Sequence, residues 1–173
     1  KDATNQMSES SPPKIPEPPP PRALPKIVST DDNTAQSCFG THYYWDEMYL
    51  GRGDFPADEY SWYFGWDVVK SFWTEAVPDK GAKVLCPGVG NDPSLFELVT
   101  AGWRHVTAFD YSENAIDRQR EILDENPSAT SNVTLHCLDA RELPEDWTGS
   151  FDAVFEKGAL DAVFLSGEGN VER

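Results

Sequence analysis

The sequence predicts an α/β protein built on a parallel, doubly wound β-sheet. Short apolar strands alternate with amphipathic helical segments from about residue 82 to residue 156. Units of this size connect neighbouring parallel strands through right-handed helical crossovers. The chain has 173 residues, which is enough for one domain with a hydrophobic core.

Residues 1–36 differ in composition from the rest of the chain, being rich in Pro and Ser ("SSPPKIPEPPPPRALP") and poor in apolar side chains. Such a segment buries too little apolar surface to offset its ordering entropy. We expect a disordered linker with polyproline character. Pro18 and Pro21 form a PxxP pattern, but no Arg or Lys is placed for an SH3 ligand, so a linker is favoured. The folded domain is then expected over residues 37–173.

The aromatic-rich segment that follows predicts the first long helix. Apolar side chains spaced three and four residues apart define one helical face from about Asp58 to Ala76, and Pro78 ends the helix. We expect core packing for three of its aromatic residues: Trp66, Phe72 and Trp73.

The alternation itself comes next. "AKVLCPG" (82–88), "HVTAFD" (105–110), "NVTLHCLD" (132–139) and "SFDAVFE" (150–156) are predicted strands. "PSLFELVTAG" (93–102) and "SENAIDRQREILDEN" (112–126) are predicted helices, the second capped by Ser112. Cys86 and Cys137 fall in strands, where cysteine usually behaves as a small buried hydrophobe.

The net charge and the cysteine content argue against a nucleic-acid-binding protein and against a zinc protein. The net charge of −16 argues against nucleic-acid binding, which needs clustered Lys and Arg. It suits a basic protein partner, although solubility alone also explains it. Three cysteines without CxxC spacing indicate a reducing compartment and no zinc site. No apolar run reaches membrane-spanning length, so we expect a cytoplasmic protein.

The strand ends carry the candidate site, because ligands of such sheets bind beyond the carboxyl ends of the strands. Gly88 and Gly90 follow the first strand and allow close approach of a ligand, but Pro93 stands where a dinucleotide site would have a third glycine. Asp110 ends the second strand about twenty residues later, where an acid can accept both hydroxyls of a ribose. A helix cap is the alternative role for this residue.

The third strand ends in Asp139 and Ala140, which suit an adenine edge, and the fourth ends in Glu156 and Lys157. Every predicted strand thus ends in a polar group or a glycine turn, and Asp110 together with the glycines favours a nucleoside ligand. Lys157 is expected to point toward Gly88 and Asp110, with Leu160 and Val163 of a following helix facing inward. A simple surface turn is the alternative, and it predicts a fully exposed Lys157.

Five segments together resemble a known family: "YYWDEMY" (43–49), "SWY" (61–63), "VLCPGVGND" (84–92), "VTAFDYSENAI" (106–116) and "FDAVFEKGALDAV" (151–163). They are similar to class I S-adenosylmethionine (SAM)-dependent methyltransferases that include the lysine methyltransferases of translation elongation factor 1-alpha. The resemblance covers about residues 39–165. Because that family continues with further strands, residues 37–173 are expected to be the N-terminal portion of the domain, ending after the fourth strand.

The resemblance implies a Rossmann-like fold, SAM as cofactor and a basic elongation-factor-like protein as substrate. It also implies a set of cofactor contacts, with no catalytic residue assigned: Trp45, Tyr49, Trp62, Gly88, Gly90, Asp110, Tyr111, Asp139, Ala140 and Lys157. Methyl transfer depends mainly on positioning and desolvation of the acceptor, so no catalytic triad is expected.

Three positions depart from the pattern of the family: Pro87, Val89 and Ala159. A Pro-Gly-x-Gly loop also resembles thiol and halide methyltransferases, which keeps a small-molecule acceptor open. A non-catalytic SAM-binding or interaction module is the alternative from another class of protein.

Overall fold

The computed structural model describes residues 35, 37–53, 61–125 and 127–166. The linker expected over residues 1–36 therefore lies almost wholly outside the described residues, and so does the start of the helix expected from Asp58.

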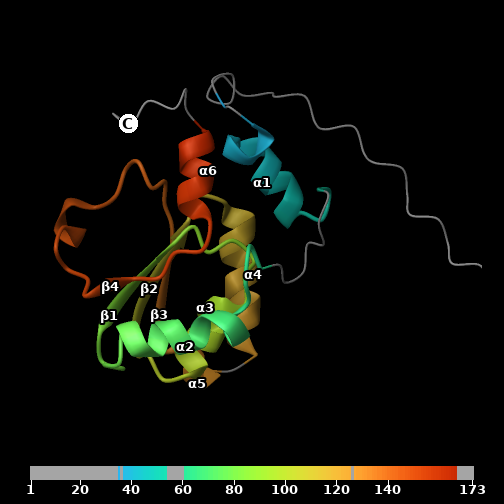
Figure 1. The fold of residues 1–173 in the computed structure, drawn as a ribbon. Helices are drawn as coiled ribbons and strands as arrows, with labels where there is room; N and C mark the ends of the chain where they lie inside the picture. The colour runs from blue at the N-terminus through green and yellow to red at the C-terminus, as the bar shows by residue number, and fades with distance from the viewer. Residues whose placement is uncertain (1–34, 36, 54–60, 126, 167–173) are drawn as a thin grey trace, which may run out of the picture.

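Four parallel strands form the sheet: β1 (Lys83–Pro87), β2 (His105–Asp110), β3 (Val133–Cys137) and β4 (Ala153–Val154). Their order is β3-β2-β1-β4, so β1 lies between β2 and β4 (Figure 1). In the register, Val84 is paired with Val106, and Val106 with Val133. All four carboxyl ends therefore meet at one edge of the sheet. The prediction of a parallel α/β fold is confirmed, although β4 is only two residues long.

Six α-helices accompany the sheet in the described residues: α1 (His42–Tyr49), α2 (Trp66–Ala76), α3 (Ser94–Thr100), α4 (Glu113–Asp124), α5 (Pro127–Thr130) and α6 (Ala159–Leu165). Two short 3-10 helices, η2 (Cys38–Gly40) and η3 (Glu145–Trp147), complete the regular structure. Figure 1 shows α1 and α6 beside each other, beyond the carboxyl ends of the strands. Among the helices of the described residues, none combines the length and the apolar character that a membrane span requires.

The two faces of the sheet are covered differently, because successive strand residues point to opposite sides. Val84, Cys86, Val106 and Ala108 share one face and pack with apolar residues of α2, α3 and α4 in the main core. On the other face, the ring of Phe109 lies 5.9 Å from that of Trp147 in η3. The helical crossovers thus bury the first face, as the alternating sequence pattern predicts.

Helix α2 begins later than predicted. Gly65 is its N-cap residue, and the described residues 61–65 are not helical. The expectation that Phe72 lies in the core is wrong, because its side chain is 70% exposed. Trp66 and Trp73 are seven residues apart and share one buried face, whereas Phe72 lies about 100° away from Trp73 around the helix.

Two other burial predictions are also wrong. Cys137 is exposed, because it lies at the end of β3, one of the two edge strands of the described sheet. Leu160 and Val163 are 67 and 46% exposed. The face of α6 that meets the rest of the protein carries Ala159, against Gly88, and Ala162, against the aromatic cluster of α1. Residues one position further along the helix therefore point outward.

The burial difference within α2 gives a matched test. Trp73 contacts the rings of Trp103 and Phe155, at centroid distances of 6.1 and 5.0 Å. Trp73→Ala should lower the free energy of unfolding by about 3–5 kcal/mol, as expected for loss of a large buried aromatic. Phe72→Ala should change it by less than about 0.5 kcal/mol. Urea denaturation measures both, and equal losses would contradict the assignment of the buried face.

Candidate functional site

The candidate site lies where the chain reverses its direction of travel across the sheet. From β1 the chain moves outward to β2 and β3, and it then returns to β4 on the opposite side of β1. The point between β1 and β4 is therefore the topological switch point, where open α/β sheets bind ligands. The loop after β1 and the segment after β4 both emerge there.

The loop after β1 (residues 88–92, here the glycine loop) depends on its two glycines. Gly88 and Gly90 have φ values of 56° and 52°, in the left-handed region that favours glycine. A Cβ atom on Gly88 would lie 2.3 Å from the Cβ of Ala159. A Cβ atom on Gly90 would lie 2.7 Å from the hydroxyl oxygen of Tyr49. Ala159 of α6 and Tyr49 of α1 therefore occupy space that a side chain at Gly88 or Gly90 would need.

Asp110, the last residue of β2, is hydrogen-bonded to the backbone of the glycine loop. Its side chain is only 4% exposed. One carboxylate oxygen accepts a hydrogen bond from the backbone N–H of Gly90 at 2.9 Å, and the other accepts from the N–H of Ser112 at 3.0 Å. Burial raises the pKa of Asp110 to about 6, although these two hydrogen bonds oppose the shift. The residue predicted to hold a ribose therefore also ties the loop to the start of α4.

An ion pair joins the glycine loop to the segment after β4. The Nζ atom of Lys157 lies 2.6 Å from Oδ2 of Asp92 and 3.2 Å from the hydroxyl oxygen of Ser94. The Lys157 and Asp92 side chains are only 12 and 16% exposed. Lys157 thus emerges at the same edge as Gly88, and the surface-turn alternative is wrong. Glu156 has a different position, because its carboxylate accepts a hydrogen bond from the backbone N–H of Leu160 at the start of α6.

Trp45, Tyr49 and Trp62 lie together beyond the carboxyl ends of the strands, where Tyr49 contacts the glycine loop. The Trp45 ring is 6.2 Å from that of Tyr49 and 5.5 Å from that of Trp62, measured between centroids. Trp45 is 8% exposed, and its indole N–H donates to the backbone carbonyl of Phe39 at 2.7 Å. Burial and the nearby Asp110 carboxylate raise the pKa of Tyr49, so its phenol keeps its proton at neutral pH. The three side chains are part of a packed aromatic cluster that also contacts the loop.

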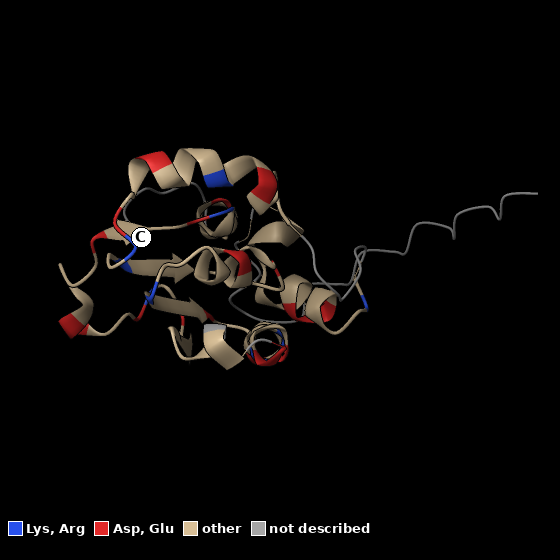
Figure 2. Cartoon of the chain, turned by 90° about the horizontal axis from the view of Figure 1, so that it is seen from below, with Lys and Arg blue, Asp and Glu red and all other residues tan. Residues whose placement is uncertain are grey.

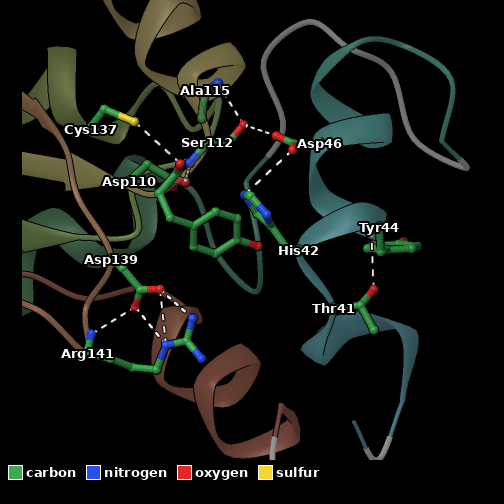
Figure 3. Close-up of polar contacts among 11 residues, drawn as sticks. Thr41, His42, Tyr44, Asp46, Asp110, Ser112, Ala115, Cys137, Asp139 and Arg141 are labelled. Atoms are coloured by element: carbon green, nitrogen blue, oxygen red, sulfur yellow. Dashed lines mark hydrogen bonds and ion pairs between the residues drawn. The ribbon is translucent and has the colours of Figure 1, made fainter. Parts of the chain in front are cut away.

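A polar connection made by His42, Asp46 and Ser112 joins α1 to the start of α4 (Figure 3). Beside it lies Tyr111. Its ring is 4.3 Å from the ring of His42 in an edge-to-face arrangement. The carboxylate of Asp46 accepts a hydrogen bond of 2.5 Å from the hydroxyl of Ser112 and lies 3.6 Å from Nε2 of His42. Ser112 also accepts from the backbone N–H of Ala115, which confirms its predicted role as the cap of α4.

The residues after β3 lie at the rim. The Asp139 carboxylate forms an ion pair with Arg141, with Nη2 2.6 Å from Oδ2, and Figure 3 shows the two side chains facing each other. Hydrogen bonding from Arg141 lowers the pKa of Asp139. Ala140 is exposed. These two predicted contacts are therefore more open to solvent than Asp110.

The sequence reasoning missed three residues that shape this site: Asp46, Asp92 and Gln119. Asp46 lies within the aromatic segment YYWDEMY, and Asp92 ends the glycine-containing segment VLCPGVGND. The carboxylate of Asp92 accepts a hydrogen bond of 2.8 Å from the backbone N–H of Ser94, the first residue of α3. An Asp just before a helical pattern is typical of a helix start, so the sequence did contain a signal for this role. Nothing in the sequence indicated Gln119, a polar residue inside a helical pattern.

Comparison with known proteins defines the class. A family model described as "Methyltransferase domain" matches residues 78–168, more than half of the chain. The chain therefore belongs to this methyltransferase family. A solved structure described as "Conversion of a Disulfide Bond into a Thioacetal Group during Echinomycin Biosynthesis" has a TM-score of 0.51 and 24% identity, covering 72% of this chain and 54% of that one. This likeness supports the fold alone.

Curated relatives are more specific. The chain is 29% identical to EEF1A lysine methyltransferase 2 of Mus musculus, over 88% of this chain and 64% of the relative. It is 32% identical to EEF1A lysine methyltransferase 4 of the same species, over 72% of this chain and 46% of the relative. The chain thus spans less than two thirds of the length of these relatives. The resemblance inferred from the sequence motifs is confirmed.

The raised pKa of Asp110 predicts a pH-dependent contribution to stability. The neutral acid is favoured in the fold, so this contribution is fully present below the ordinary pKa of 3.8 and is lost as the pH rises through about 6. Asp110→Asn cannot titrate. The free energy of unfolding of the wild type relative to the variant should therefore fall by as much as about 3 kcal/mol between pH 4 and pH 7. Denaturant titrations at several pH values measure it, and a constant difference would contradict the raised pKa.

Proposed function

We propose that this protein is a SAM-dependent methyltransferase that methylates a lysine of translation elongation factor 1-alpha or a closely similar protein. The observation that carries the proposal is the similarity to EEF1A lysine methyltransferase 2 over 88% of this chain. The glycine loop and Asp110 lie within the matched family region and occupy the switch point of the sheet. Because the chain spans only part of its relatives, the activity is proposed for the whole protein.

The residues present fit a nucleoside cofactor. Gly88 and Gly90 give the loop a left-handed backbone conformation that glycine supports, and Ala159 of α6 and Tyr49 of α1 pack closely against it. Each oxygen of the Asp110 carboxylate accepts one N–H, and a carboxylate oxygen has a second acceptor position for a ribose hydroxyl. We assign the ribose to Asp110, and the adenine to Tyr111, Asp139 and Ala140.

The methionine end of SAM carries both an ammonium and a carboxylate group. The Lys157–Asp92 pair presents the complementary charges between β1 and β4. We assign this end to Gly88, Gly90 and Lys157, with the cluster of Trp45, Tyr49 and Trp62 excluding water above it. SAM, when bound, supplies a methyl group on a sulfonium. The protein contributes orientation and desolvation, since the acceptor amine must reach the methyl group without its proton.

The charge of the chain supports a basic protein as the acceptor. Asp and Glu number 30 against 14 Lys and Arg, and acidic positions are distributed over several elements of the described structure (Figure 2). Such a surface attracts a basic partner and repels nucleic acid. A translation-factor substrate also implies a cytoplasmic location. The names of the relatives favour a protein acceptor over a thiol or halide.

The cofactor assignment predicts a defined loss of affinity. Asp110→Ala in the full-length protein should weaken SAM binding by about 1.5–3 kcal/mol, the scale of hydrogen bonds to a charged group. Asp117→Ala removes an exposed carboxylate from α4 and should leave the affinity unchanged. Calorimetric titration measures both variants, with circular dichroism confirming that each is folded. Equal affinities for Asp110→Ala and wild type would remove Asp110 from the cofactor site.

The substrate assignment is tested by methyl transfer. The full-length protein and labelled SAM should methylate purified elongation factor 1-alpha on a lysine, identified by peptide mass spectrometry. Substitution of the modified lysine by Arg should abolish incorporation of label. Transfer to small thiols or halide ions, with none to the protein, would contradict the proposed substrate class.

A further inference from the structure

Gln119 of α4 reaches the glycine loop from the interior of the protein. Its side chain is fully buried, with an exposed fraction of 0%. The amide nitrogen Nε2 donates to the backbone carbonyl of Gly90 at 2.9 Å and to that of Asp92 at 2.9 Å. These acceptors lie 29 and 27 positions earlier in the chain. One side chain thus joins the middle of α4 to two points of the loop.

The chemistry of these contacts requires a side chain with two donor hydrogens. Carbonyl oxygens only accept hydrogen bonds, so a side chain placed between two of them must supply two hydrogens, as the NH₂ group of Gln does. In the described part of the chain, the Oε1 atom of Gln119 has no hydrogen-bond partner. The described hydrogen bonds of this side chain therefore all go to the glycine loop. Burial of a polar side chain is unfavourable unless its hydrogen bonds compensate, so packing alone does not explain a Gln here.

Gln119 and Asp110 act on the same residue from two directions. Asp110 accepts from the N–H of Gly90, and Gln119 donates to the C=O of Gly90. Both backbone groups of this glycine are therefore fixed, although glycine has the greatest conformational freedom of all residues. The C=O of Gly90 and the N–H of Asn91 belong to one planar trans peptide and point in opposite directions. Holding the carbonyl toward α4 therefore also fixes the direction of the Asn91 N–H.

We propose that Gln119 is a positioning residue for the cofactor, acting through the backbone of the glycine loop. The proposal rests on the proposed function, because it assigns SAM to that loop. Gln119 itself touches no cofactor atom in this account. It holds the carbonyls of Gly90 and Asp92 so that the loop presents one conformation to the ligand, and it thereby reduces the ordering that binding would otherwise require.

The first test does not depend on the cofactor. Gln119→Met in the full-length protein keeps a flexible side chain of similar length but removes both donors. Amide hydrogen exchange should then be about 10-fold faster at Gly90, relative to the amides of β1, because the loop opens locally. Ile122→Val, on the same helix and also buried, is the matched control and should leave this ratio unchanged. Equal ratios in wild type and Gln119→Met would overturn the proposal.

The second test measures SAM affinity at equal folded fraction. Gln119→Met should weaken binding by about 10-fold or more, corresponding to two neutral hydrogen bonds, with Ile122→Val close to wild type. Gln119→Glu can donate one hydrogen only when it is protonated, so its affinity relative to wild type should recover as the pH is lowered. Taking the ratio removes the pH dependence that both proteins share, including the titration of Asp110 as it occurs in the wild type. A ratio independent of pH, or full affinity in Gln119→Met, would overturn the positioning role.

The two tests separate failure of the proposal from failure of the proposed function. Absence of SAM binding by the full-length wild type would refute the cofactor assignment, and with it the positioning of SAM by Gln119. Faster exchange at Gly90 in Gln119→Met would still show that Gln119 holds the loop. Normal SAM binding by the wild type together with unaltered binding and exchange in Gln119→Met would refute the proposal alone.

Discussion

The candidate site depends on the buried carboxylate of Asp110. Its two oxygens accept hydrogen bonds from the backbone of Gly90 and of Ser112, so one side chain connects the glycine loop to the start of α4. Asp110 is the last residue of β2; this strand is paired to β1 from His105 to Phe109, and Asp110 itself is paired to Cys137 of β3. The position of the loop is therefore set by the sheet itself. The energetic cost of this arrangement appears in the raised pKa of a buried acid.

Other contacts converge on the same short loop from segments far apart in the chain. Gln119 approaches it from α4, Lys157 from the segment after β4, and Tyr49 from α1. A backbone held on several sides in this way has little freedom to rearrange, and preorganisation of this kind favours ligand binding. The missing side chains of Gly88 and Gly90 make these approaches possible, since a Cβ atom at either position would collide with α6 or α1.

Much of the fold followed from local pattern. The apolar runs predicted all four strands, and β2 has the predicted bounds, because buried parallel strands read as short continuous apolar segments. The glycines and Asp110 were predicted to lie together at the carboxyl-end edge of the sheet, and there the Asp110 carboxylate accepts a hydrogen bond from the N–H of Gly90. The burial predictions failed where burial depends on which neighbouring element packs against the residue. Phe72 lies in the predicted helix but on its exposed face, and Cys137 lies in the predicted strand, which is at the edge of the described sheet.

The sequence by itself determined the strand–helix alternation, the glycine loop and the residues at the strand ends, since these depend on periodicity and on backbone geometry over a few residues. Only the tertiary structure decided what those residues contact. Lys157 is paired with Asp92 across 65 positions of the chain, and Gln119 bonds to carbonyls 27 and 29 positions away. Such contacts exist only after the sheet has brought β1, β2 and β4 together. The local pattern around Gln119 is that of an ordinary helix, so its role depends on packing and has no signature in the sequence.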